Sequence, residues 1–327
     1  MQNAVNRIGV LTSGGDAPGM NSAIRAVVRT AVSSGIECIG IRRGYHGLIA
    51  ADFNPLEASD VNGLMDRGGT ILYTARCNEF FKEEGILRAA DNCRYMGIDA
   101  VVAIGGDGTF KGAAALSKHG IPVIGIPATI DNDIACTSYT IGYDTACNTA
   151  VELIDKLRDT MKSHERCSVV EVMGHRAGHL ALYVGIASGA TAILIPERET
   201  NYETDLFEPI RNGRLGGRTH FTVVVAEGAG PAGEVASKIK EHTGIETRLT
   251  VLGHVQRGGT PLVRDRVIAT RMGHSAVHLL AQGKFNRIVC FNGSKCTDVD
   301  INDALNMTKG LDDDVYAILN ETVVANR

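Results

Sequence analysis

The chain has 327 residues, of which 44% are hydrophobic and 21% are charged, and its formal net charge is −4. This length allows two packed lobes, and the slightly acidic balance argues against a general binder of nucleic acid or of anionic membranes. The eight cysteines form no C-x-x-C pair and the N-terminal residues lack the apolar run of a signal peptide, so we expect free thiols in a reducing cytoplasm.

Apolar runs alternate with helix-like segments along the chain. The first run, at residues 8–11, precedes a glycine-rich turn and a predicted helix at residues 22–33, which places Arg25 and Arg29 on one face. Further predicted strands occupy residues 38–41, 100–104, 122–126, 169–172, 192–195, 221–225 and 288–291. Because most of these runs are continuously apolar, they indicate parallel strands covered by helices on both faces. The sequence therefore predicts an α/β fold.

One uncharged stretch, at residues 180–196, needs a separate explanation. It is shorter than the roughly 20 apolar residues that a membrane span requires, and it contains several glycines. We therefore predict a buried helix that leads into a strand, and no membrane association.

Three loops rich in glycine or carboxylate follow predicted strands, at residues 14–16, 105–109 and 129–133. In open α/β sheets, ligands bind outside the carboxyl ends of the strands. Glycine lets backbone N–H groups approach phosphate oxygens, and the N-terminus of a following helix favours negative charge. A single Gly-Gly-Asp turn taken alone is better explained as a tight turn that binds nothing. The three loops together indicate phosphoryl transfer.

Carboxylates in these loops suit two different roles. Asp107 lies between glycines and is suited to a magnesium ion that bridges nucleotide phosphates, although a helix N-cap would explain it too. Asp131 is the better candidate for a base that takes the proton of an acceptor hydroxyl, and Asp133 would orient either Asp131 or the water shell of the metal.

Basic residues stand near the same loops. Arg76 is placed to reach a transferred phosphate. Without the neighbouring motifs, it would be interpreted as a solvated surface arginine. His254 and Arg257 share a glycine-flanked turn suited to phosphate.

Two further arginines and two histidine pairs also need an interpretation. We expect Arg166 and Arg248 to add to the phosphate pocket. Two histidine pairs, 175/179 and 274/278, have the spacing of a helical metal site, but without an H-E-x-x-H pattern ordinary histidines are favoured.

With these residues assembled, the chain resembles the bacterial-type ATP-dependent 6-phosphofructokinases, the phosphofructokinase A family. The resemblance extends over nearly the whole length, and its order and spacing of motifs are highly specific. The segments that carry it are residues 11–21, 67–70, 104–109, 129–133, 169–174 and 252–259.

This resemblance implies a fold of two lobes, each a mainly parallel sheet covered by helices. Residues 1–141 plus 255–304 would form the nucleotide-binding lobe, and residues 142–254 plus 305–327 the sugar-phosphate-binding lobe. It implies transfer of the γ-phosphoryl group of ATP to the 1-hydroxyl of fructose 6-phosphate in glycolysis, with Mg²⁺, in the cytoplasm. It also implies an allosteric homotetramer, in which Arg166 and Arg248 reach into a neighbouring subunit's active site.

The resemblance assigns roles residue by residue. The catalytic residues would be Asp131, Arg76 and Thr129. The nucleotide would be bound by Gly15, Tyr45, Arg76, Cys77, Gly106, Asp107, Gly108 and Thr109, with Asp107 also holding the metal. The sugar phosphate would be bound by Thr129, Ile130, Asp131, Arg166, Met173, Gly174, His175, Glu227, Arg248, His254, Val255, Gln256 and Arg257.

An effector site for ADP or phosphoenolpyruvate is implied between subunits. Its members would be Arg25, Arg29, Arg158, Arg218 and His220. Other positions of this site differ from those of the best-known regulated members: Ala58, Gly63, Thr191 and Gly216. We therefore expect a weak or altered response to ADP.

Three alternatives stay open. Pyrophosphate-dependent members of the family carry Asp and Lys where this chain has Gly108 and Ala128, which favours ATP. A catalytically weak regulatory or ligand-binding paralogue is supported only by His175, where the family usually has Arg. NAD kinases and diacylglycerol-kinase-like lipid kinases share the Gly-Gly-Asp-Gly-Thr segment, but they lack the other motifs.

Overall fold

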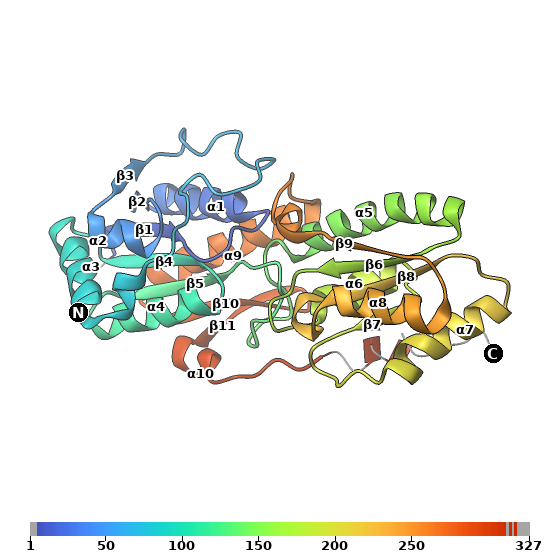
Figure 1. The fold of residues 1–327 in the computed structure, drawn as a ribbon. Coiled ribbons are helices and arrows are strands. Elements are labelled where there is room, and N and C mark those ends of the chain that lie inside the picture. The colour runs from blue at the N-terminus through green and yellow to red at the C-terminus, as the bar shows by residue number, and fades with distance from the viewer. Residues whose placement is uncertain (1–4, 312–313, 316, 319–327) are drawn as a thin grey trace. The chain divides into compact units, whose positions relative to one another are not determined.

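The computed structural model describes residues 5–311, 314–315 and 317–318. These residues divide into two compact units, which we describe one at a time (Figure 1). The first takes its described residues from Met1–Ile130, Ile134–Thr145 and Arg257–Lys309, and the second from Asp131–Asp133, Ala146–Gln256 and Gly310–Arg327. Which unit binds which ligand stays a prediction.

A seven-stranded sheet forms the centre of the first unit, in the order β11-β10-β5-β4-β1-β2-β3. Its inner strands are parallel, and β3 and β11 pair antiparallel at the two edges. The strands are β1 (Arg7–Thr12), β2 (Glu37–Ile41), β3 (Phe53–Leu56), β4 (Ala100–Gly105), β5 (Val123–Pro127), β10 (Arg287–Asn292) and β11 (Lys295–Asp300).

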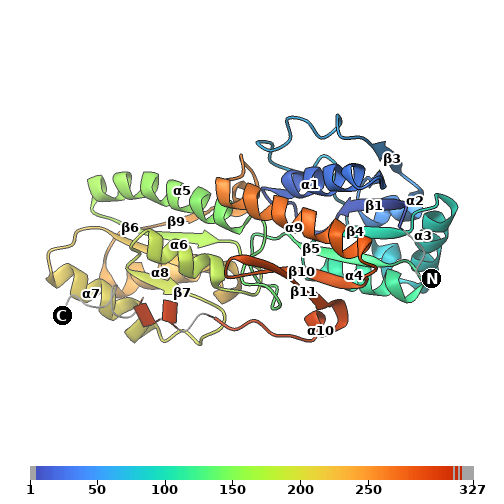
Figure 2. The same ribbon diagram turned by 180° about the vertical axis from the view of Figure 1, so that it is seen from behind.

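Helices cover both faces of this sheet (Figures 1 and 2). On one face, α1 (Met20–Ser33) packs on α9 (Val263–Ala281) so closely that a Cβ at Gly273 would lie 2.8 Å from the Ala23 carbonyl oxygen. The other face carries α2 (Tyr45–Ala50), η1 (Asn78–Phe81), α3 (Glu83–Tyr95), α4 (Asp107–Lys118) and α10 (Ile301–Leu305).

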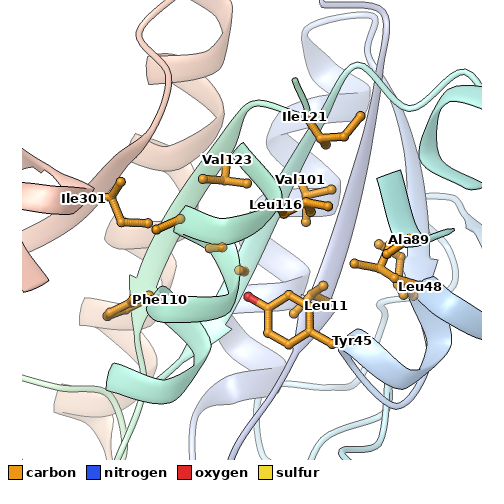
Figure 3. Packing of buried hydrophobic residues seen from close by; sticks show 14 of the residues in the cluster. Leu11, Tyr45, Leu48, Ala89, Val101, Phe110, Leu116, Ile121, Val123 and Ile301 are labelled. Atoms are coloured by element: carbon orange, nitrogen blue, oxygen red, sulfur yellow. The ribbon is translucent and has the colours of Figure 1, made fainter. Parts of the chain in front are cut away.

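The core on this second face is continuous. Figure 3 shows Leu11, Val101 and Val123 of the strands beside Phe110 of α4 and Ile301 of α10. All five side chains are almost completely buried. Burial of such apolar surface is the main stabilising contribution to the unit and holds the strand ends in register.

The second unit contains a four-stranded parallel sheet in the order β7-β8-β6-β9. Its strands are β6 (Cys167–Val172), β7 (Ala192–Leu194), β8 (Phe221–Ala226) and β9 (Thr247–Val251). Its helical segments are α5 (Tyr143–His164), whose first residues belong to the first unit, α6 (His179–Ala187), η2 (Glu203–Phe207), α7 (Glu208–Leu215), η3 (Glu227–Ala229), α8 (Ala232–Thr243) and η4 (Gly253–Arg257), whose last residue belongs to the first unit.

The predicted α/β fold is confirmed, and every strand predicted from an apolar run is present. The strands that the sequence did not indicate are β3, β9 and β11, and all three lie at a sheet edge. The uncharged stretch forms α6 and β7, as predicted. Among the described residues, no helix is long and apolar enough to cross a membrane.

Candidate active site

Three of the predicted site loops leave neighbouring parallel strands of the first unit. Thr12 of β1 is paired with Ile104 of β4, and Gly105 of β4 with Pro127 of β5. The loops that follow these strands therefore begin at one edge of the sheet. This register brings together the glycine turn after β1, residues 105–109 after β4, and Thr129 after β5.

Hydrogen bonds tie these loops to one another. Ser13 N–H donates to the Ile104 carbonyl at 3.0 Å, and the Thr109 hydroxyl donates to the Ser13 carbonyl at 3.0 Å. Ala128 N–H donates to the Gly105 carbonyl at 2.9 Å. The Thr109 side chain thus holds two loops together and is buried, so its predicted contact with a nucleotide would have to come from its backbone.

Two glycines at this edge have contrasting surroundings: one is tightly packed and the other faces open space. A Cβ at Gly105 would collide with the Ser13 carbonyl oxygen, so the close approach of the two loops requires glycine there. At Gly108, in contrast, a Cβ would meet nothing within 4 Å. The exposed backbone at Gly108 is therefore open to a ligand at the N-terminal turn of α4.

Asp107 is the first residue of α4, after the N-cap residue Gly106, and not the N-cap itself. Its carboxylate is about half exposed and lies 2.6 Å from the Lys111 ammonium, one turn along the helix. Lys111 was missed by the sequence reasoning, although its spacing of four from Asp107 would have indicated the pair.

The residues around Asp107 suit a magnesium ion. Among the described residues, no group of three or more His, Cys, Asp or Glu could hold a metal. Mg²⁺ commonly takes only one or two carboxylates and completes its shell with water and substrate phosphates. A half-exposed Asp107 beside open glycine backbone matches that donor set.

The remaining predicted nucleotide contacts differ in exposure. Tyr45 is buried, stacks on Phe80 with ring centroids 4.2 Å apart, and its hydroxyl donates to the Thr109 carbonyl. Burial raises the pKa of Tyr45 well above its ordinary value. Tyr45 therefore acts as packing beneath the loop. Arg76 is exposed and Cys77, just before η1, is half-buried.

Arg257 reaches the glycine turn after β1. A Cβ at Gly15 would lie 2.8 Å from Cζ of Arg257, so only glycine permits this approach. The Nε atom of Arg257 is buried and has no hydrogen-bond partner within the described part of the chain. A buried guanidinium N–H without a partner is costly, and an anionic ligand over Gly15 would satisfy it.

Thr129, Ile130 and Asp131 follow β5 after one intervening residue, Ala128. The Thr129 carbonyl accepts a hydrogen bond from the Thr140 hydroxyl at 2.7 Å, and Ile130 is buried. Asp131 is half-buried. Asp131 and the two residues after it belong to the second unit, whereas Thr129 and Ile130 belong to the first.

In the second unit, the predicted sugar-phosphate residues gather at the carboxyl ends of β6 and β8. Val172 is paired with Ala226, so Met173 and Glu227 both begin the loops at this end. His175 N–H donates to the Glu227 carboxylate at 2.7 Å. His175 has a φ of 55°, a left-handed conformation in which its side chain is exposed.

The η4 turn joins the same end of this sheet. Gln256 is buried, accepts a hydrogen bond from Met173 N–H at 3.3 Å and donates to the Gly253 carbonyl at 2.9 Å. His254 and Val255 are exposed. Gln256 therefore positions the turn, while His254 is available to a ligand.

Arg166 and Arg248 lie at the opposite end of the second sheet. Arg248 is paired with Ser168 near the start of β6, and Arg166 directly precedes that strand. Met173 is five residues beyond Ser168, and at about 3.3 Å per residue this separates the two ends of the strand by about 16 Å. The structure therefore does not bring these two arginines to the Met173 loop of their own chain. Arg248 instead pairs with Glu246 at 3.3 Å.

The predicted effector residues fall into two groups. Arg25 and Arg29 lie on α1 of the first unit, where Arg29 donates to Asn62. Arg158, Arg218 and His220 lie in the second unit, and Lys162 joins them. Burial, and then the positive charges of Lys162, Arg158 and Arg218, lower the pKa of His220. Lys162 was missed, although it stands four residues after Arg158 on α5.

Comparisons with known proteins identify the family of this chain. Residues 7–280 match a family model described as Phosphofructokinase. The chain is 53% identical over 311 residues to an ATP-dependent 6-phosphofructokinase of Clostridium botulinum, which covers 95% of this chain and 97% of that protein.

Two solved structures share the fold. The phosphofructokinase of Saccharomyces cerevisiae matches with a TM-score of 0.89 and 33% identity, over 98% of this chain and 47% of the yeast chain, so the chain spans about half of that relative. A pyrophosphate-dependent phosphofructokinase of Nitrosospira multiformis matches with a TM-score of 0.85 and 20% identity, over 98% and 91% of the two chains. The second likeness concerns the fold alone.

Proposed function

Because this chain belongs to the phosphofructokinase family, we propose that it transfers the γ-phosphoryl group of ATP to the 1-hydroxyl of fructose 6-phosphate. The products are ADP and fructose 1,6-bisphosphate. The observation that supports this proposal best is the register of β1, β4 and β5, which sets the glycine turn, the Asp107 loop and Thr129, two residues before Asp131, at one sheet edge.

Each group at this edge has one chemical task. Backbone N–H groups at Gly106 and Gly108, at the N-terminus of α4, face the phosphates of the nucleotide. Asp107 would hold Mg²⁺, which would supply positive charge to neutralise the phosphate oxygens. The guanidinium groups of Arg76 and Arg257 add positive charge where negative charge develops in the transition state.

Asp131 accepts the proton of the 1-hydroxyl as the hydroxyl oxygen attacks the γ-phosphorus. The P–O bond to the leaving ADP breaks in the same displacement. Thr129, held by Thr140 through its carbonyl, keeps the Asp131 loop in place. In the second unit, His254, Glu227 and the Met173 loop bind the sugar phosphate.

ATP is favoured over pyrophosphate as the phosphoryl donor. The position that carries Asp in pyrophosphate-dependent members is Gly108, which has open space around it, and the position that carries Lys is Ala128, which is 1% exposed. An uncharged, open Gly108 accommodates the α-phosphate and nucleoside. The fold likeness to the Nitrosospira protein does not bear on this choice.

Shared active sites explain the placement of Arg166 and Arg248. The two arginines lie about 16 Å from the Met173 loop of their own chain, which is too far for them to bind a phosphate there. If they bind the sugar phosphate, they bind it in the site of another chain. We therefore propose a homotetramer in the cytoplasm, with these arginines completing a neighbour's sugar-phosphate pocket.

A coupled spectrophotometric assay tests the proposal directly. Purified protein should form fructose 1,6-bisphosphate from fructose 6-phosphate with Mg²⁺ and ATP, and should form little with Mg²⁺ and pyrophosphate. The reverse preference would make the chain a pyrophosphate-dependent enzyme. No product with either donor at saturating concentrations would favour a ligand-binding paralogue.

A further inference from the structure

Helix α9 carries two histidines whose rings face each other outside the candidate active site. His274 and His278 stand one turn apart, and their Nε2 atoms lie 3.0 Å from each other. The ring centroids are 4.2 Å apart, and both residues are exposed. Neither residue has a task in the proposed phosphoryl transfer.

The distance between the two Nε2 atoms matches a chelate. An imidazole nitrogen binds Zn²⁺ and similar ions at about 2.0–2.1 Å, and two such nitrogens at coordination angles of about 90–110° are about 3 Å apart. We propose that His274 and His278 form a two-imidazole binding site for a divalent transition-metal ion, with water completing the coordination shell.

Neutral imidazole offers a lone pair to a metal ion, so a cation held against the two rings would compete with that ion. Of the nearby cations, Arg271 lies over the Phe291 ring at 5.0 Å and donates to the Ser294 carbonyl at 2.6 Å. Arg271 is thereby held away from the ring nitrogens.

A cavity beside His274 leaves room for water ligands. It has a volume of about 530 Å³ and lies between α9 and the start of β11, which are side by side in Figure 2. Cys296 also lines it, but burial raises the pKa of its thiol, so we do not count it as a ligand. Two imidazoles favour Ni²⁺, Cu²⁺ or Zn²⁺ over Mg²⁺, which prefers oxygen.

The second histidine pair of the chain shows that spacing alone does not make such a site. His175 and His179 are also four residues apart, but His175 lies in a loop with a φ of 55° and His179 is the first residue of α6. Only the pair on α9 lies wholly within one helix.

Calorimetric titration with Ni²⁺ tests the site in tag-free protein. Ni²⁺ is chosen because it favours imidazole, whereas Zn²⁺ would also be taken up by free thiols, and saturating Mg²⁺ keeps carboxylates occupied. We expect one Ni²⁺ per chain. Either His274→Ala or His278→Ala should weaken its binding on the order of a hundredfold, because each removes the intramolecular second ligand.

Two controls separate the site from general histidine binding. His46→Ala removes an exposed histidine elsewhere and should leave the Ni²⁺ affinity unchanged. Ni²⁺ should also raise the thermal midpoint of the wild-type protein but not that of His278→Ala. Absence of binding, or equal weakening by His46→Ala, would overturn the proposal without affecting the proposed kinase activity.

Discussion

Asp131 carries the proton chemistry of the proposed reaction, and its substitution is the most direct test at the scale of one residue. Asp131→Ser removes the acceptor but leaves the loop and the sugar-phosphate residues of the second unit. We expect kcat to fall about a thousandfold while the KM for fructose 6-phosphate stays nearly constant.

Steady-state kinetics and calorimetric binding of fructose 6-phosphate check this expectation. Asp133→Ser, two residues further along, is the matched control and should cost much less. A kcat that barely changes in Asp131→Ser would show that another group takes the proton.

Gly108 tests the choice of phosphoryl donor. No atom lies within 4 Å of a Cβ at this position, so Gly108→Asp should fold normally. Its carboxylate would stand beside the phosphates, where repulsion of about 3 kcal/mol lowers kcat/KM for ATP about a hundredfold.

The coupled assay measures this loss, and Gly108→Ala should keep most of the activity. An unchanged kcat/KM for ATP in Gly108→Asp would place the triphosphate elsewhere. The urea midpoint of each variant serves as the check that the fold is intact.

At the scale of elements, Asp265 anchors the segment that follows the Asp131 loop. This fully buried carboxylate near the start of α9 accepts hydrogen bonds from the Tyr139 hydroxyl at 2.6 Å, from Gly142 N–H at 2.6 Å and from Thr145 N–H at 2.9 Å. It thereby fixes the start of α5 against α9.

Asp265→Asn replaces one carboxylate oxygen, which accepts hydrogen bonds, by an NH₂ group. This group donates hydrogen bonds and would face the other donors that surround the side chain. We expect a loss of about 3 kcal/mol in the free energy of unfolding, measured by urea denaturation. Asp91→Asn, which breaks an exposed pair with Arg94, should cost less than about 0.5 kcal/mol. Equal midpoints for the two variants would contradict the anchoring role.

The cationic group formed by Arg158, Lys162, Arg218 and His220 predicts a pH-dependent anion site. Burial, and then the neighbouring cations, lower the pKa of His220, and a bound anion would raise it again. Anion binding therefore takes up a proton, and sulfate affinity should rise as the pH falls through the range in which His220 is protonated, by at most about tenfold per pH unit.

Calorimetry with sulfate, which does not titrate in this range, measures the slope. His220→Gln should abolish the pH dependence and keep most of the binding at neutral pH. A slope that persists in His220→Gln would mean that another group takes up the proton. The weak response to ADP stays a separate prediction.

The three strands that the sequence did not predict, β3, β9 and β11, all lie at the edge of a sheet. Interior strands such as β4 are buried throughout and read as continuous apolar runs. β9 and β11 carry exposed or half-exposed residues along most of their length, and β3 contains a proline that an interior strand would not tolerate. Their pairing depends on a neighbouring strand, so local sequence does not indicate it.

At the scale of the whole molecule, shared active sites predict complementation. Asp131→Ser and the double variant Arg166→Ala/Arg248→Ala should each be nearly inactive at low fructose 6-phosphate. After mixing and reassembly, about a quarter of the sites combine an intact Asp131 with a neighbour's intact arginines, so activity should return.

The matched control mixes Asp131→Ser with Gly108→Asp. Both changes lie in the part of a site that one chain supplies, so no mixed assembly contains an intact site. Activity that returned in this control, or failed to return in the first mixture, would contradict sharing between subunits.

The sequence by itself determined the α/β fold class, the interior strands, the family and the chemistry of the three loops. These follow from local patterns, because continuous burial requires apolar runs and phosphate-binding turns require glycine. Only the tertiary structure decided that Asp265 holds residues 139–145, that Arg248 stands at the far end of the sheet from Glu227, and that the rings of His274 and His278 face each other on α9. Such contacts depend on strand register and packing between distant segments, which no local pattern encodes.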